Sequence, residues 1–199
     1  SLQLDFARDL PQGWSISQKE PDRLFDVFIT LKLREDICLN AYQFREGEDG
    51  EGVVWALPQG AAFSEPKSCF DEEEEMPIPE RSLNDFMLAV DGDGSALSYL
   101  SSSLLARQLL EWGAFGNGVY WGTFKILGVN PLDNSRMINN SDPKQGPTGS
   151  PEQWIWEGIR PAEWQPVVAT KGVDRVNVTF YTYCGQDYQR ITRHVDEYE

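Results

Sequence analysis

Large apolar residues recur every three or four positions between residues 96 and 112, which is the period of one face of an α-helix. Asp93 or Ser95 can cap the first turn, and Gly113 stands where a helix commonly ends in the left-handed conformation. The pattern predicts a main helix near residues 95–112, followed by a turn rich in glycine and aromatic residues. Its apolar stripe consists of Leu97, Leu100, Leu104, Leu105, Leu109 and Trp112.

The chain before this helix alternates apolar and polar residues, which is typical of half-buried strands. The segments concerned are 2–6, a start at Trp14, 24–33 and 37–44, and the apolar run 53–57 after a glycine-rich turn predicts a further strand. Their links are too short for parallel crossovers, so we expect an antiparallel meander, with a hairpin between 24–33 and 37–44. Leu83, Phe86, Met87 and Val90 have helical spacing and predict a short helix.

Two further segments, 123–129 and 173–183, predict strands after the helix. Tyr188, Ile191, Val195 and Tyr198 then recur at intervals of three, four and three, which predicts an amphipathic C-terminal helix. Strands, then helices, then strands indicate the α+β class: an antiparallel sheet with the main helix and the C-terminal helix packed on one face.

A length of 199 residues suits one domain, so we predict a single domain over 1–199. Two stretches are rich in proline and polar residues, near 58–81 and 130–153, and we expect long surface loops there. There is no apolar run long enough to cross a membrane. Three cysteines at wide spacing favour reduced thiols, and no signal peptide is visible, so we expect a cytoplasmic protein of unknown oligomeric state.

The formal net charge is −15, and it is unevenly distributed. Residues 61–94 carry ten acidic and two basic residues, including the acidic run Asp71, Glu72, Glu73, Glu74 and Glu75. Such a field repels phosphate backbones and anionic membranes, so we expect neither nucleic-acid binding nor membrane insertion. A basic surface on a partner protein fits the charge best, although a run of like charges is also typical of a solvated loop.

The motifs of common catalytic sites are missing. Residues 91–95 (Asp-Gly-Asp-Gly-Ser) begin like a calcium loop but lack its later glycine and glutamate, so we read them as a turn and helix cap. No phosphate-cradling glycine motif occurs, and one histidine with three scattered cysteines builds no zinc site. A Cys184–His194 dyad oriented by Asp196 is conceivable, but a surface histidine in the predicted tail helix is the preferred interpretation. We therefore predict no metal and no cofactor.

Aromatic residues offer two candidate sites. Trp154, Trp156 and Trp164 flank a polar loop and prolines, where exposed aromatics are typical of protein interfaces. The second is a pocket beside the main helix, lined by Trp112, Phe115, Tyr120 and Trp121. A carboxylate such as Glu111 would then act as acid or base in an enzyme.

These observations predict a non-enzymatic protein-binding module, such as an assembly factor, adaptor or inhibitor. It would use the acidic run and the three loop tryptophans against a partner with a basic surface. The alternative is a small-molecule-binding protein or enzyme with the aromatic pocket. A nucleic-acid mimic is a third class, disfavoured because 17 basic residues dilute the negative field.

Overall fold

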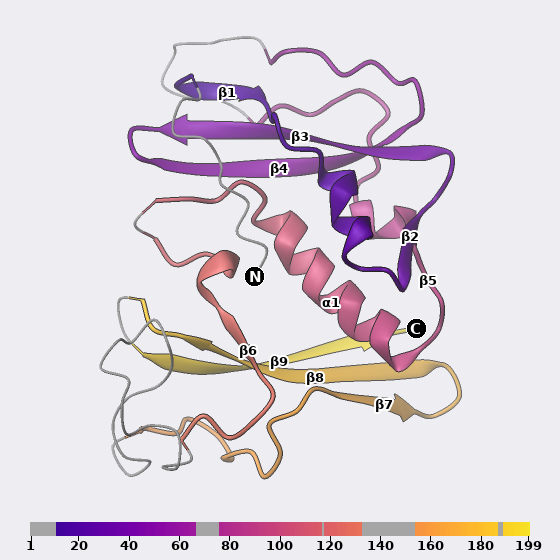
Figure 1. The fold of residues 1–199 in the computed structure, drawn as a ribbon. Coiled ribbons are helices and arrows are strands. Elements are labelled where there is room, and N and C mark those ends of the chain that lie inside the picture. The colour runs from indigo at the N-terminus through magenta and orange to yellow at the C-terminus, as the bar shows by residue number, and fades with distance from the viewer. Residues whose placement is uncertain (1–10, 67–75, 117, 133–153, 187–188) are drawn as a thin grey trace. The chain divides into compact units, whose positions relative to one another are not determined.

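The computed structural model describes residues 11–66, 76–116, 118–132, 154–186 and 189–199 (Figure 1). Contacts divide the chain into two compact units, which we call the N-terminal unit (residues 2–122) and the C-terminal unit (residues 123–199). The single domain predicted over 1–199 stays a prediction, because a grouping of contacts does not measure whether the units fold separately. The predicted strand at 2–6 lies outside the described residues.

The N-terminal unit contains a three-stranded antiparallel sheet in the order β1-β3-β4. Its strands are β1 (Gly13–Ile16), β3 (Ile37–Glu46) and β4 (Asp49–Pro58). β3 and β4 form a long hairpin closed by a tight turn, in which Gly47 has the left-handed φ of 60°. This confirms the strands predicted at 37–44 and 53–57 and the one beginning at Trp14.

The main helix is α1 (Ala96–Leu110), which contacts β4, β2 and β5 of the same unit. Ser95 caps it by accepting from the Ser98 N–H at 3.1 Å, and Gly113 has a φ of 74°, so both predicted helix ends are confirmed. The predicted apolar stripe is wrong at its start. Leu97 is 56% exposed, whereas Ser98 and Ser101 are buried.

Small side chains on α1 are favoured where it meets the β2–β5 ribbon. The Ser101 hydroxyl accepts from Thr30 at 3.3 Å, and a Cβ at Gly92 would lie 3.1 Å from the Ser98 oxygen. A leucine at either serine would not fit this spacing. The apolar core of the unit therefore begins one turn later on the helix. It consists of Leu24, Leu31, Ile37, Leu39, Ala41, Val54, Ala56, Ala89, Leu105, Leu109 and Trp112.

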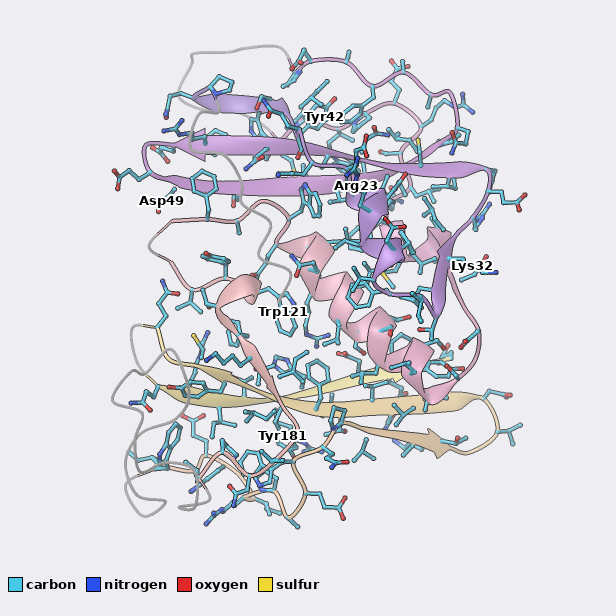
Figure 2. The ribbon with its side chains drawn as sticks, in the orientation of Figure 1. Arg23, Lys32, Tyr42, Asp49, Trp121 and Tyr181 are labelled. Atoms are coloured by element: carbon cyan, nitrogen blue, oxygen red, sulfur yellow. The ribbon has the colours of Figure 1, made fainter. Side chains whose placement is uncertain are left out.

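The other face of this sheet is covered by the segment that follows β4. Tyr42 points away from α1 and stacks on Phe63 with ring centroids 4.4 Å apart (Figure 2). Its hydroxyl donates to the Ser64 carbonyl at 2.8 Å. Burial and the nearby Glu65 carboxylate raise the pKa of Tyr42. The first residues of the predicted 58–81 loop thus form part of the folded unit.

The strand predicted at 24–33 and its hairpin with 37–44 are wrong. Residues Pro21–Asp26 form a 3₁₀ helix (η1), which proline favours at its start, and only Leu31–Leu33 (β2) is extended. β2 pairs with β5 (Val90–Gly92), not with β3. Ile29 is 78% exposed, so the alternating apolar residues of 24–33 do not all lie on a buried face. The helix predicted near residue 83 is a short 3₁₀ helix, η2 (Phe86–Ala89), capped by Asp85.

The C-terminal unit is an antiparallel sheet centred on the long strand β8 (Arg175–Cys184). β9 (Arg190–Tyr198) pairs along one side of β8. On the other side, β7 (Val167–Lys171) pairs with the first half of β8 and β6 (Lys125–Leu127) with the second half. A short 3₁₀ helix, η3 (Trp121–Thr123), precedes β6 in the chain. The strands predicted at 123–129 and 173–183 are confirmed.

The predicted C-terminal helix is wrong, because residues 190–198 form strand β9. Nine consecutive residue pairs join it to β8. The more buried face of β9 carries His194 and Asp196, while the apolar Val195 is exposed. Polar residues on the inner face conceal the alternation that marks a strand, and pairing with β8 decides the structure.

All the strand pairs described are antiparallel, and helices are few, which agrees with the coarse α+β prediction. No helix among the described residues is long and apolar enough to span a membrane. The described part of the predicted loop at 58–81 contains no helix or strand after Pro58. Residues 67–75 and 133–153, which include most of the second predicted loop, lie outside the described residues.

Candidate functional site

A groove of about 1410 Å³ lies within the C-terminal unit. One wall is the segment 154–162, which has no helix or strand. The other wall consists of Tyr181 on β8 and residues 189–193, which include the first half of β9. Tyr181 is labelled in Figure 2, and its strand, β8, is labelled in Figure 1. The groove is thus formed by a sheet and by an irregular segment held beside that sheet.

Packed aromatic rings attach the irregular segment to the sheet. Trp164 is 5% exposed and packs on Tyr181, with ring centroids 5.4 Å apart. Trp156 meets Trp164 edge-on, with centroids 6.3 Å apart. A buried indole removes a large apolar area from water, so Trp164 is the anchor of the segment.

The outer wall of the groove exposes large apolar side chains. Ile155 is 93% exposed and Ile159 is 99% exposed, beside the partly buried Trp154 and Trp156. One exposed isoleucine is ordinary on a protein surface. Two isoleucines and two indoles within six residues form a concentrated apolar surface, which is typical of an interaction site.

The inner wall of the groove includes the backbone of β9. Side chains along a strand alternate between its two faces, yet the four consecutive residues 190–193 all line the groove. A groove lined by consecutive residues contacts the strand's backbone as well as its side chains. β8 pairs with one edge of β9, and no other described strand pairs with the second edge.

The described residues that line the groove are rich in arginine, although the protein is acidic. They include Arg160, Arg190 and Arg193, with Glu157 as the one acidic residue among the described lining. Arg160 lies over the Trp156 ring, 5.7 Å from its centroid, and Arg190 lies over Phe124 at 5.1 Å. Stacking on a ring orients a guanidinium while its N–H donors still reach an anion.

The structure brings together two of the three tryptophans predicted for partner binding. Trp154 and Trp156 line the groove, whereas Trp164 is buried beneath it as a core residue. Sequence reasoning missed the arginines and the exposed isoleucines. The sequence does contain a signal for the exposed isoleucines. They lie among glycine, proline and tryptophan residues, without the apolar–polar alternation of a half-buried strand. Arg190 and Arg193 were assigned to a helix that does not exist, so their position was not predictable in that way.

The acidic run from Asp71 to Glu75 lies outside the described residues. Its predicted role in partner binding therefore stays a prediction from charge.

The aromatic residues predicted to line a pocket beside the main helix have separate surroundings. Trp112 is 1% exposed in the core of the N-terminal unit, and its indole N–H donates to Ser17 at 3.3 Å. Phe115 forms a short backbone bridge with Gly50 of the β3–β4 hairpin. Arg107 lies over the Trp121 ring, 5.8 Å from its centroid, and the backbone N–H of Trp121 donates to the Glu111 carboxylate. These contacts, with the half-buried Tyr120, connect the turn to its own unit, and none of the four predicted residues lines the groove.

The conceivable Cys184–His194 dyad is excluded by strand register. Cys184 lies opposite Arg190, and His194 lies opposite Phe180, four residues further along the ladder. Four residues of extended chain correspond to roughly 13 Å, which is far beyond proton-transfer distance. His194 stacks on Phe180 and hydrogen-bonds the Thr182 hydroxyl at 2.8 Å. Asp196 lies two residues from His194 on the same face of β9.

The turn before α1 is a cap, as the sequence predicts. The Asp93 carboxylate accepts from the Ser95 N–H at 2.9 Å. Hydrogen bonds from the Ser95 side chain and from its backbone N–H lower the pKa of Asp93. Within the described residues, no three His, Cys, Asp or Glu side chains gather where they could hold a metal ion.

Antiparallel sheets and one long helix place this chain in the sheet-rich part of the α+β class. Comparison with protein-family models, with curated proteins and with solved structures finds no match. The groove and the charge pattern of the chain are therefore the features that indicate a function.

Proposed function

We propose that this protein is a non-enzymatic binding module that captures another protein in the groove of its C-terminal unit. The observation that carries the proposal is the nearly complete exposure of Ile155 and Ile159 beside the indoles of Trp154 and Trp156. Covering an isoleucine side chain contributes roughly 1.5–3 kcal/mol, so a partner that buries both would gain substantial affinity. Assembly factors, adaptors and inhibitors are the classes that work in this way.

Photo-crosslinking tests this function at the surface that the proposal names. A benzoylphenylalanine placed at Ile159 should give a discrete adduct with a partner protein in native extract. Val173 is also apolar and 93% exposed, but it lies in the turn between β7 and β8, so it is a matched control position. Equal crosslinking at both positions would indicate non-specific contact and would refute the proposal.

Reconstitution with the purified partner then tests energetics. We expect Ile155→Ser with Ile159→Ser to weaken binding at least tenfold, because two apolar contacts of about 1.5 kcal/mol or more are lost. Val173→Ser should leave affinity unchanged. Unchanged affinity in the double variant would place the partner elsewhere on the molecule.

The acidic run supports a second, electrostatic contribution to partner capture. Five consecutive acidic side chains attract a basic surface and accelerate association. Replacing Asp71 to Glu75 with serine should weaken binding at about 0.05 M salt and reduce the dependence of affinity on salt. If neither quantity changes, the acidic run has no part in binding. The wide cysteine spacing still favours a reducing compartment such as the cytoplasm as the place of action.

A further inference from the structure

We propose that the groove receives an extended acidic segment of the partner protein, which adds to the edge of β9 as a further strand. This inference rests on the proposed function and specifies the chemistry of the partner at the same site. It differs from the contribution of the acidic run, which would attract a basic surface on the partner.

The geometry of β9 favours an extended occupant. Four consecutive residues, 190–193, line the groove, so an occupant lies against the β9 backbone as well as against its side chains. A peptide added at a sheet edge gains affinity from main-chain hydrogen bonds and specificity from alternate side chains. The segment 154–162 lines the same groove and would contact the side chains of the added strand.

The charge of the groove favours acidic residues in the occupant. Arg193 and Arg160 are exposed, and among the described residues that line the groove Glu157 is the one acidic residue. In a protein of net charge −15, a local excess of positive charge is a selective feature and not a general property of the surface. A carboxylate beside an arginine forms hydrogen bonds strengthened by charge on both partners.

Strand register indicates where the acidic and apolar side chains of the occupant would lie. Arg193 is opposite Tyr181 and Ile191 is opposite Tyr183, so Arg193 and Ile191 share the face that carries the Trp164 anchor. An added strand would present a residue opposite Arg193 and another, two positions away, opposite Ile191. An acidic residue suits the first position, and a β-branched apolar residue suits the second.

A fluorescent nine-residue peptide that alternates glutamate and valine is the probe for this inference. We expect it to bind the full chain at about 0.05 M salt and to release as salt rises toward about 0.5 M. The matched glutamine–valine peptide should bind at least tenfold more weakly. Equal binding of the two peptides would overturn the assignment of an acidic occupant.

Variants of the protein locate the charge effect. Arg193→Gln should weaken peptide binding about threefold and the double variant Arg160→Gln with Arg193→Gln about tenfold, in the range of partly exposed ion pairs. Lys32→Gln removes one positive charge from an exposed side chain on β2 in the N-terminal unit and is the control (Figure 2). An equal loss in the control would show a non-specific charge effect and would overturn the inference.

Amide hydrogen exchange distinguishes strand addition from binding by side chains alone. Bound peptide should slow exchange at least tenfold for one or more backbone amides among residues 191–193, with little change in the β7–β8 turn. Peptide that binds without protecting these amides would overturn the strand-addition geometry.

Four further outcomes test this inference, and the first two separate it from the proposed function. If the peptide does not bind but Ile159 still crosslinks a partner, the inference fails and the function stands; if crosslinking also fails, both fail. Tighter binding of single-stranded DNA than of the peptide would overturn the acidic-protein assignment. Self-association that is lost in the double arginine variant would identify a second copy as the occupant and would also overturn it.

Discussion

The carbonyl oxygen of Trp112 lies so close to Gly52 that a Cβ atom on this glycine would stand 2.4 Å from it. The residues after α1 thus pack directly on the backbone of β4. Gly50, two residues away on the same face, makes a backbone bridge to Phe115. The hairpin can receive the aromatic turn only because these two positions lack side chains.

Gly52→Ala should destabilise the N-terminal unit by roughly 2 kcal/mol, because the added methyl group would force the β4 backbone and Trp112 apart. Urea unfolding followed by circular dichroism measures the effect. Gly118→Ala is the control, since a Cβ there would meet nothing within 4 Å. A loss as small in Gly52→Ala as in the control would show that the contact relaxes without cost.

A buried amide joins β3 to the end of the main helix. The Gln43 side chain is 2% exposed and donates to the Gly113 carbonyl at 3.4 Å. Gln43→Leu keeps the approximate shape but leaves this carbonyl without that donor, so we expect a loss of about 1–3 kcal/mol. The exposed Gln59 also donates to a carbonyl, that of Ile37, and Gln59→Leu should cost less because water can replace the bond. Equal losses in the same unfolding assay would contradict this account.

The first turn of α1 depends on Ser95. Its hydroxyl accepts from the Ser98 N–H, so Ser95→Ala should lower the free energy of unfolding by about 1 kcal/mol. Ser95→Asp keeps an acceptor at the cap and should recover most of this loss. If alanine and aspartate have the same effect on thermal unfolding, the cap contributes nothing to stability.

Asp93 makes the stability of this helix start dependent on pH. Hydrogen bonds from Ser95 lower the pKa of Asp93 below its ordinary value of 3.8. A lowered pKa in the folded state contributes stability above pH 3.8, and this contribution is lost as the pH falls through the folded-state pKa. Asp93→Asn should therefore be less stable than the wild type at pH 7, and the two should converge as the pH falls through the lowered pKa of Asp93. A constant difference across this range in urea titrations would exclude the carboxylate as its source.

Trp164 and Trp154 should behave differently although both flank the same groove. Trp164→Ala removes a 5%-exposed indole from Trp156 and Tyr181, and should destabilise the C-terminal unit by roughly 3–5 kcal/mol. Trp154→Ala should change stability by about 1 kcal/mol or less and should instead weaken partner binding. Thermal unfolding combined with the reconstituted binding assay separates the two effects. The reverse result would exchange the structural and binding roles of the two tryptophans.

The sequence alone determined the elements whose signals are local. The main helix has its period, its cap at Ser95 and its left-handed glycine within about twenty residues of chain, and all three were predictable. Strands β3 and β8 alternate clearly, and β4 contains a short apolar run after a glycine-rich turn, so their existence was predictable as well. Trp154 and Trp156 were predictable as binding candidates from their composition alone.

Only the tertiary structure decided the features that depend on distant partners. Residues 190–198 have helical spacing, but pairing with β8 makes them a strand and brings Arg190 and Arg193 to the groove. Residues 24–33 alternate, yet η1 and the pairing of β2 with β5 leave Ile29 exposed. The three loop tryptophans are alike in sequence, and packing on Tyr181 selects Trp164 as the buried one. The physical reason is that strand pairing and burial are energies between distant segments, which neither local period nor composition reports.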